Sequence, residues 1–396
     1  MSSAWLLPEH IADVLPAQAR RVEELRRVWL DAARGYGFEL VMPPLLEHIE
    51  SLLSGTGHAL DLKTFKLVDQ LSGRTLGVRA DATPQVARID AHLLNREGVT
   101  RLCYCGPVLH TRPASPHASR EPLQLGAEIY GHVGLEADLE AMELALEGLE
   151  VAGLTDLVLD LADVRLVQGV IEALGLGSLD AAARSELMMA LTNKDVARLR
   201  ELASCPAWSA APKAGEVFSA MTGLFGNEDV LLRAGQVLPQ HPLIEAALAD
   251  LAWLAGHVRQ SLRKVSIGFD LSDLSGHAYY SGTRFAIYGA GHADALVRGG
   301  RYDEVGAVFG RRRPAVGFSL DLKILAELLG RQGVTTRSAV RAPWGEDPTL
   351  RQAVRDLRGQ GHTVVCVLPG HEHDVQEFDC DRELALVDGH WSVRSL

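Results

Sequence analysis

Residues 299–325, GGRYDEVGAVFGRRRPAVGFSLDLKIL, combine a double-glycine turn, a basic loop and an apolar strand that leads into a helix. From the apolar pattern we predict strands at 293–298 and 315–320 and a helix at 321–330. The helix opens with Asp321, Lys323 and Ile324. Isoleucine has neither a charge nor a hydrogen-bond donor with which to bind an anion. The pattern therefore predicts two strands and a helix, with an apolar side chain at position 324 near the start of the helix.

This stretch resembles the third signature of class II aminoacyl-tRNA synthetases of the histidyl type. In that family, a GGRYD turn leads through an A-V-G-F strand to a helix that begins G-x-E-R. The matching residues are Gly299, Gly300, Arg301, Tyr302, Asp303, Ala315, Val316, Gly317 and Phe318. The family's glycine, glutamate and arginine are replaced by Asp321, Lys323 and Ile324.

Three other segments resemble the same family. Pro44–Glu47 is similar to the end of the dimer-forming first signature, and Arg101–Gly131 to the second signature. Leu274–Phe285 is similar to the histidyl-specific segment R-G-L-D-Y-Y-t-G-T-x-F. The resemblance covers about residues 8–330. It implies an α+β fold, a class II synthetase-like core with a mostly antiparallel sheet.

Three arginines that serve the adenylate step in this family have no counterpart here. Their positions correspond to His110, Ser275 and Ile324. Fixed cations offset the charge that develops on phosphorus and pyrophosphate, and removing one such donor costs about 3–4 kcal/mol of barrier. Losing three is expected to slow amino-acid activation by many orders of magnitude. We therefore assign no catalytic residues and expect no cofactor.

The residues that cradle free histidine in this family are mostly retained. The resemblance assigns Asp81, Thr83 and Gln124 to the ammonium group, and Glu128 with a tyrosine hydroxyl, from Tyr279 or Tyr280, to the imidazole N–H groups. Asp81 is one methylene shorter than the family's glutamate. Taken singly, Gln124 and Glu128 alternate with apolar residues and fit the polar face of a strand. A pocket kept only for packing is the alternative.

Retained pocket residues beside missing arginines are typical of the regulatory subunit of ATP phosphoribosyltransferase, the first enzyme of histidine biosynthesis. That resemblance implies a non-catalytic chain that activates the short-form catalytic subunit in a hetero-octamer and allows feedback regulation by histidine. It also implies a self-dimer through the synthetase-like core. Whether histidine binds the synthetase-like pocket or a subunit interface is left open.

Two other functions compete with this one. An active histidyl-tRNA synthetase is disfavoured by His110, Ser275 and Ile324. A synthetase-derived tRNA-binding or sensor module is disfavoured by the formal charge of −12, because tRNA binders need a basic surface. The basic run Arg311–Arg313 is expected to form a solvated loop rather than a contact with a partner or a nucleotide. We therefore expect no nucleic acid as partner.

Composition is that of an ordinary globular chain of 396 residues, with 47% hydrophobic and 23% charged residues. Five scattered cysteines indicate a reducing compartment. Cys103 and Cys105 lack a second close pair, so we expect core thiols and no metal site. No apolar run reaches the roughly 20 residues of a membrane span, and the N-terminus does not resemble a signal peptide. A cytoplasmic protein is expected.

Periodicity divides the chain into three parts. Residues 1–163 and 264–330 are expected to form the core, with strands at 155–162, 265–271 and 277–288. Residues 164–263 are mainly helical in pattern and correspond to the helical insertion of histidyl synthetases. Residues 331–396 form a linker and a small α/β domain, with a helix at 347–358 and strands at 363–368, 382–387 and 390–395. Asp388-Gly389 predicts a hairpin turn between the last two strands.

Overall fold

The computed structural model describes residues 5–53, 57–116, 118–209, 211–262, 264–274, 279–331, 339–371 and 380–396. The chain divides into two compact units, Met1–Gly330 and Arg331–Leu396. Within the described ranges, every helix is too short or too polar to cross a lipid bilayer.

Nine strands, counted over the described residues, form the main sheet of the first unit in the order β1-β5-β6-β12-β11-β10-β7-β9-β8. They are β1 (Glu39–Leu40), β5 (Thr100–Pro107), β6 (Leu123–Tyr130), β7 (Val158–Asp163), β8 (Phe225–Gly226), β9 (Ser266–Asp270), β10 (Thr283–Tyr288), β11 (Val297–Arg301) and β12 (Ala315–Asp321). Only the β1–β5 and β7–β9 pairs of this sheet are parallel. The predicted α+β fold with a mostly antiparallel sheet is confirmed.

Strand β6 shows why this sheet has two different faces. Leu125, Ala127 and Ile129 alternate along it and are at most 3% exposed within the main hydrophobic core. Gln124 and Glu128 occupy the intervening positions and face the opposite side. One face of the sheet therefore packs the core, while the other carries polar groups.

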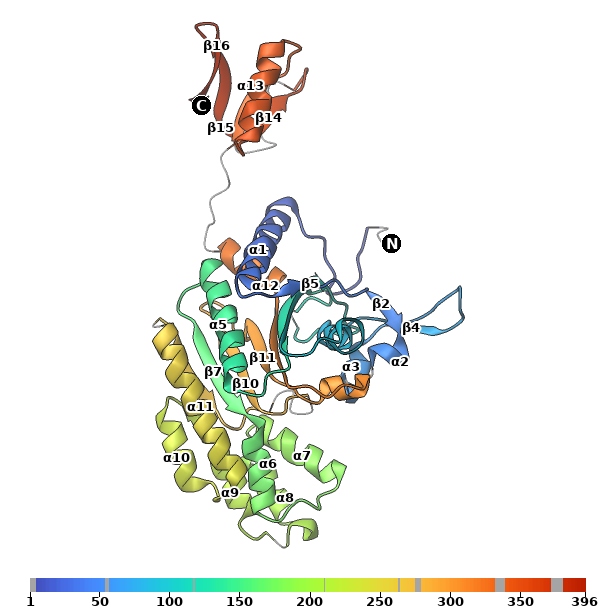
Figure 1. The fold of residues 1–396 in the computed structure, drawn as a ribbon, viewed down its shortest axis with the longest axis vertical. Coiled ribbons are helices and arrows are strands. Elements are labelled where there is room, and N and C mark those ends of the chain that lie inside the picture. Colours follow the sequence, from blue (N-terminus) through green and yellow to red (C-terminus); the bar gives the residue numbers. More distant parts are fainter. Residues whose placement is uncertain are drawn as a thin grey trace. The chain divides into compact units, whose positions relative to one another are not determined.

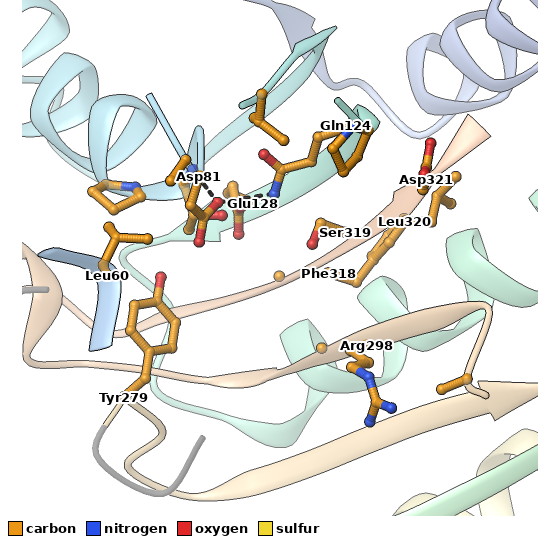
Figure 2. Close-up of a pocket in the computed structure, with 18 of the residues that line it drawn as sticks. Leu60, Asp81, Gln124, Glu128, Tyr279, Arg298, Phe318, Ser319, Leu320 and Asp321 are labelled. Atoms are coloured by element: carbon orange, nitrogen blue, oxygen red, sulfur yellow. Dashed lines mark hydrogen bonds between the residues drawn. The ribbon is translucent and has the colours of Figure 1, made fainter. Parts of the chain in front are cut away.

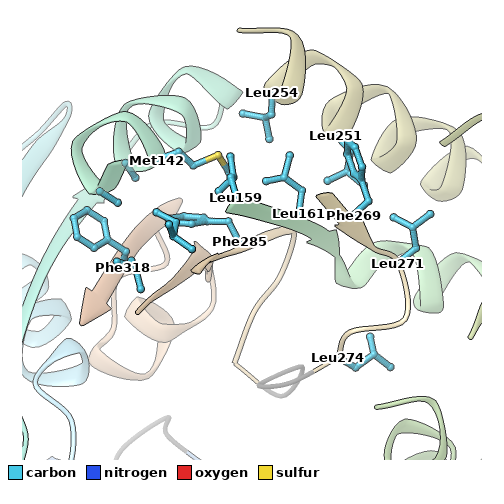
Figure 3. Close-up of a cluster of buried hydrophobic side chains, with 14 of the residues drawn as sticks. Met142, Leu159, Leu161, Leu251, Leu254, Phe269, Leu271, Leu274, Phe285 and Phe318 are labelled. Carbon is cyan, nitrogen blue, oxygen red and sulfur yellow. The ribbon is translucent and has the colours of Figure 1, made fainter. Parts of the chain in front are cut away.

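The core joins the sheet to the helices that cover it. Figure 3 shows Met142 of α5 (Leu135–Val151) close to Phe285 of β10 and Leu159 of β7. Leu251 and Leu254 of α11 (Pro242–Ser261) extend the same cluster to Phe269 of β9. Buried apolar area of this kind contributes about 25 cal/mol per Å².

Helix α1 (Pro16–Gly35) packs against α5 through one large side chain. Trp29 is 1% exposed and lies against Gly148, where a Cβ atom would overlap its ring. Helix α12 (Leu322–Arg331) follows β12 and donates a hydrogen bond from Lys323 N to Asp321 Oδ1 at its start (2.9 Å). Figure 1 shows α1, α5 and α12 on the same side of the sheet.

A group of helices is inserted between β7 and β9. It contains α6 (Val164–Ala173), α7 (Ala181–Thr192), α8 (Val196–Ala203), η2 (Pro206–Trp208), α9 (Ala214–Met221), α10 (Asp229–Val237) and α11. Asp163, at the end of β7, caps α6 by accepting a hydrogen bond from Arg165 N (2.9 Å). The Arg165 guanidinium bonds Asp163 and also Asp250 of α11 (2.7 Å). This network fastens two inserted helices to the sheet.

A small sheet lies next to β5, in the order β2-β4-β3. Its elements and the neighbouring helices are β2 (Leu46–His48), α2 (Ile49–Leu52), α3 (Gly57–Lys63), β3 (Lys66–Val68), β4 (Thr75–Val78), α4 (Thr83–Arg88) and the π-helix η1 (Ile89–Leu94). The antiparallel strands β3 and β4 form a hairpin around Leu71-Ser72-Gly73. Arg79, directly after β4, donates to Pro43 O (2.7 Å) and Pro107 O (2.8 Å), which ties the small sheet to β5.

Two predicted strands begin at the wrong residue. Of the strand predicted at 277–288, residues 277 and 278 lie outside the described residues, and 279–282 form a turn before β10. The strand predicted at 293–298 is β11, which continues through Gly299 and Gly300. These glycines are strand positions where a Cβ would overlap the rings of Phe285 and Tyr280. Close ring packing, which a sequence pattern does not reveal, therefore requires glycine at both positions.

The prediction of a solvated loop at Arg311–Arg313 is wrong for Arg313. Its side chain is 9% exposed and donates to both carboxylate oxygens of Asp90 (2.8 and 2.9 Å) and to Gly98 O. Arg311 and Arg312 are more exposed and bond Asn95 and Glu304. A buried carboxylate in the chain-distant helix η1, invisible to local pattern, draws Arg313 inward.

The second unit contains β13 (Ala339–Pro343), α13 (Pro348–Gly359), β14 (Thr363–Val367), β15 (Cys380–Val387) and β16 (His390–Ser395). Its strands lie in the order β14-β13-β15-β16. Asp388 and Gly389 have φ values of 48° and 77° in the turn between β15 and β16, which confirms the predicted hairpin. A separate core contains Val340, Ala342, Leu350, Val354, Val364 and Leu384.

Candidate functional site

A cavity of about 540 Å³ lies against the polar face of the main sheet. It is lined by residues of β6, β11 and β12, by the segment around Asp81 and by the turn that precedes β10. All six predicted pocket residues border it: Asp81, Thr83, Gln124, Glu128, Tyr279 and Tyr280. The fold thus brings together side chains that are up to two hundred residues apart in sequence.

Glu128 is the most deeply buried acid in this cavity, with 1% of its surface exposed. Its Oε1 accepts a hydrogen bond from the Tyr104 hydroxyl (3.1 Å), and its Oε2 accepts one from the Tyr302 hydroxyl. Burial raises the pKa of Glu128 to about 8, against the lowering effect of those hydrogen bonds. The carboxyl group is therefore largely protonated at neutral pH in the unliganded chain.

Asp81 and Gln124 hold each other in place at the cavity wall. Gln124 Nε2 donates to Asp81 Oδ1 (2.8 Å), which Figure 2 shows as a dashed line. Gln124 Oε1 accepts from Ala82 N (2.9 Å). Asp81 Oδ1 also accepts from Thr83 N at the start of α4 (3.0 Å). The Thr83 hydroxyl lies 2.9 Å from the Tyr104 hydroxyl. This chain of hydrogen bonds connects Asp81 to Glu128.

Tyr279 offers an unused polar group to the cavity. Its hydroxyl is buried and has no hydrogen-bond partner among the residues that the structure describes. Figure 2 shows this hydroxyl pointing toward Asp81. An unpaired buried hydroxyl costs about 1–3 kcal/mol, so a ligand that pairs with it gains that amount.

Tyr280 lies differently from Tyr279. The two rings pack edge to face, with their centroids 5.6 Å apart. The Arg284 guanidinium stands 5.9 Å from the centre of the Tyr280 ring. Burial raises the pKa of Tyr280 to about 12. Of the two, the Tyr279 hydroxyl is the one that is both fully buried and without a partner among the described residues.

Two of the three positions that correspond to family arginines also line the cavity, namely His110 and Ile324. His110 Nε2 lies 2.9 Å from Ala80 O, and burial, together with the positive charge of Lys63, lowers the His110 pKa and favours the neutral ring. The third position, Ser275, lies outside the described residues. Near Ile324, Asp321 Oδ1 accepts from Leu123 N (3.0 Å), and Lys323 Nζ donates to Glu121 O (2.6 Å). These bonds tie β12 and α12 to β6.

Two glycines make room for the buried acid. A Cβ atom on Gly317 would overlap the Glu128 carboxylate, and one on Gly126 would overlap the Tyr104 hydroxyl. Gly317 pairs with Glu128 across β12 and β6, and Gly126 lies two residues before Glu128 on β6. The sequence does not show why these positions are glycines. Their requirement is steric, because the acid and its tyrosines lie flat on the sheet.

Three residues that shape the cavity were not predicted as site residues. Tyr104 and Tyr302 donate to Glu128, and Arg298 of β11 contributes a cation to the lining. The GGRYD motif could have indicated Tyr302 as a site residue. Arg298 could have been noticed as a charged residue in an apolar strand, directly before the paired glycines.

Together these groups can bind a small molecule with several N–H donors. Acceptors converge from Asp81, Glu128 and the Tyr279 hydroxyl. Among the residues that the structure describes, no cluster of three or more metal-binding side chains occurs.

Comparison with known families divides the chain at the same place as its two units. The family described as Histidyl-tRNA synthetase matches residues 10–325. The family described as ATP phosphoribosyltransferase subunit HisZ C-terminal domain matches residues 337–394.

Two full-length relatives carry the same name. The chain is 60% identical to the ATP phosphoribosyltransferase regulatory subunit of Verminephrobacter eiseniae, with 100% of each chain covered. It is 59% identical to that of Albidiferax ferrireducens, again with 100% coverage of both.

Solved structures agree with this fold. An ATP phosphoribosyltransferase regulatory subunit/histidyl-tRNA synthetase from Bacillus halodurans is similar with a TM-score of 0.78 and 25% identity, covering 92% of this chain and 93% of that one. Histidyl-tRNA synthetase from Nostoc sp. PCC 7120 shares the fold at a TM-score of 0.80 and 18% identity, covering 100% of this chain and 97% of that one. Sequence, cavity and relatives thus agree, and the chain belongs to the ATP phosphoribosyltransferase regulatory subunit family, built on a class II histidyl-tRNA synthetase-like fold.

Proposed function

We propose that this chain is a non-catalytic regulatory subunit that activates the short-form catalytic subunit of ATP phosphoribosyltransferase and makes it sensitive to histidine. One observation carries the proposal. The six expected histidine-binding residues surround a single cavity, whereas His110 and Ile324 in the same cavity replace arginines of the resembled synthetases. The site keeps groups for an amino acid and lacks groups for activating it.

Histidine is the proposed ligand, and each pocket residue has a role. Asp81, positioned by Gln124 and by Thr83 N, accepts from the ammonium group. The imidazole N–H groups donate to Glu128 and to the Tyr279 hydroxyl, which gains the partner that it lacks among the described residues. Tyr280 packs beside Tyr279 and fixes its ring. The hydrogen bond made by the charged ammonium group contributes about 1.5–3 kcal/mol, and those to neutral groups about 0.5–1.5 kcal/mol each.

Lack of ligase activity is part of the proposal. Each missing cationic donor raises the barrier of adenylate formation by about 3–4 kcal/mol. Histidine-dependent exchange of labelled pyrophosphate into ATP measures this step directly. We expect no exchange above background, and exchange at an ordinary enzymatic rate would show an active synthetase instead.

Regulation requires two states of the assembly that bind histidine differently, because equal affinity for both states shifts neither. The proposed coupling is about 1–3 kcal/mol, which is typical of allosteric effectors. A second copy of this chain, joined through the synthetase-like core, and the catalytic subunit are the proposed partners.

The cavity assignment is tested by calorimetric titration of the isolated chain with L-histidine. Tyr279→Phe removes a hydroxyl that has no partner among the described residues, so stability is expected to stay the same or rise slightly. Affinity is expected to fall about three- to tenfold, the effect of one lost hydrogen bond. Tyr130→Phe is the matched control, since Tyr130 is a buried tyrosine that does not line the cavity.

Two results would contradict the cavity assignment. Unchanged affinity in both Tyr279→Phe and Gln124→Ala would move histidine to a subunit interface. Failure to co-purify with a short-form catalytic subunit would remove the regulatory role itself. In the assembled complex, we expect Tyr279→Phe to raise the histidine concentration that halves phosphoribosyltransferase activity, without lowering activity in the absence of histidine.

A further inference from the structure

Arg298 is a cation of the cavity that the proposed binding scheme does not use. It lies on β11, where it pairs in register with Ser319 of β12, and both residues line the cavity. In the view of Figure 2, Ser319 and Phe318 lie between Arg298 and the group formed by Asp81, Gln124 and Glu128. Arg298 therefore borders the cavity on the side of Ser319, apart from Asp81, Gln124 and Glu128.

The present partner of Arg298 is easily exchanged. Its guanidinium bonds Asp294, four residues away, in a pair whose side chains are 41% and 65% exposed. Exposed pairs of this kind contribute about 0–1 kcal/mol. A ligand anion can replace Asp294 at little cost, because a guanidinium presents two parallel N–H donors to a carboxylate or a phosphate.

The cavity lining carries charges of both signs. Its acidic residues are Asp81, Glu128 and Asp321, and its described cationic residues are Arg298 and Lys63. Asp321 Oδ1 is occupied by the backbone N–H groups of Leu123 and Lys323. Lys63 is the last residue of α3, and its backbone oxygen accepts from Thr111 N (3.0 Å), which places it beside the His110 segment. Volumes of about 300–1,000 Å³ are typical of sites for drug-sized ligands. The 540 Å³ found here leaves room beyond an imidazole and an amine.

We propose that the cavity takes an imidazole-bearing amine with an anionic group, carboxylate or phosphate, and that Arg298 is the residue that binds this group. The inference rests on the proposed function and specifies the ligand class of the same site. The imidazole and ammonium ends lie with Glu128 and Asp81. The anionic end lies toward Arg298, with the Ser319 hydroxyl between them as a second donor.

Three ligands that differ at one group test the inference. L-Histidine carries a carboxylate, L-histidinol a neutral hydroxymethyl group, and L-histidinol phosphate a phosphate ester. Titration calorimetry of the full chain should give L-histidinol an affinity about tenfold lower than L-histidine, the loss of one charge-assisted contact. L-Histidinol phosphate should bind at least as tightly as L-histidine. If L-histidinol phosphate binds more weakly than L-histidinol, the inference is overturned.

Substitutions identify which cation is responsible. In Arg298→Met, the ratio of L-histidine to L-histidinol affinity should fall to about one, while Arg298→Lys should keep part of the discrimination because the charge remains. Arg312→Met is the matched control, because Arg312 has the same kind of exposed ion pair, with Glu304, and does not line the cavity. Its affinity ratio should equal that of the unmodified chain.

Lys63→Met distinguishes the two cations of the lining. If the ratio collapses in Lys63→Met and persists in Arg298→Met, the anion belongs to Lys63 and the inference is wrong. Equal affinity of the unmodified chain for L-histidine and L-histidinol also overturns it, while leaving histidine binding intact. If none of the three ligands binds, the proposed function fails first and this inference fails with it.

Discussion

The carboxyl group of Glu128 lies inside the protein between the hydroxyls of Tyr104 and Tyr302. Both tyrosines have pKa values raised well above the usual one, chiefly by burial and then by the nearby charge of Glu128. A sequence shows only that an acid occupies position 128. Its protonation at neutral pH follows from the low-dielectric surroundings that the fold builds.

This shifted pKa predicts how stability depends on pH. A carboxyl whose pKa rises from 4.5 unfolded to about 8 folded keeps its proton in the native state after the unfolded chain has lost it. Its contribution is present below pH 4.5 and is lost as pH rises toward 8. Each pKa unit corresponds to about 1.4 kcal/mol, which allows a loss of a few kcal/mol.

Glu128→Gln tests this dependence, because the amide cannot ionise. As pH rises from 5 to 8.5, the free energy of unfolding of the variant should fall less than that of the unmodified chain. Urea unfolding of the first unit measures this free energy at each pH. Identical pH dependence of the two proteins would mean that Glu128 is already ionised in the native state.

At the scale of elements, the Ala, Glu and Leu content of Leu135–Val151 favours a helix, and this segment forms α5. That content does not explain the glycine within it. Gly148 lies where Trp29 of α1 crosses, so the absence of a side chain is a packing requirement. Strand and helix types follow from local periodicity, whereas contacts between elements depend on residues far apart in sequence.

Two glycine-to-alanine substitutions distinguish the effect of helix propensity from the effect of side-chain packing. Gly256→Ala, in α11 with no atom near the added methyl group, should stabilise the protein by about 0.5–1 kcal/mol. Gly148→Ala should destabilise it by roughly 1–3 kcal/mol, because the methyl group overlaps the Trp29 ring. Thermal unfolding should show a higher melting temperature for Gly256→Ala and a lower one for Gly148→Ala. Stabilisation by both would show that Trp29 can move aside.

For the whole molecule, a row of apolar side chains along the β1–β2 segment is exposed in the single chain. Met42 is 77% exposed, Leu45 45% and Leu46 42%. The proposed self-dimer buries this segment, which belongs to the stretch that resembles the dimer-forming signature. A charge there would remain unpaired in a buried interface.

Met42→Asp is therefore expected to shift the protein from dimer to monomer in sedimentation velocity. Leu71→Asp is a control at a loop position, where an apolar side chain is 98% exposed outside that segment. A dimer of unchanged strength in Met42→Asp would place the interface elsewhere.

The second unit has its own core, so damage there is expected to stay local. Leu384 is 3% exposed within that core. Leu384→Ala should cost about 2–4 kcal/mol of local stability, seen as faster hydrogen exchange in 339–371 and 380–396. Histidine affinity should not change. A parallel loss of affinity would show that the two units are energetically coupled.

The three-part division, with a core at 1–163 and 264–330, an insertion at 164–263 and a C-terminal domain from 331, stays a prediction. The observed split at Gly330 and the network of Arg165 with Asp163 and Asp250 are the structural facts that bear on it.

The sequence by itself determined the α+β class and the C-terminal hairpin, because periodicity and turn residues are local properties. Its resemblance to the synthetase signatures indicated the six residues that line one cavity. Only the tertiary structure decided that Arg313 is buried against Asp90, that the Tyr279 hydroxyl has no partner among the described residues and that Arg298 adds a cation to the cavity. It also decided the protonation of Glu128. These properties depend on burial and on charges brought together from distant segments, and no local pattern encodes such distances.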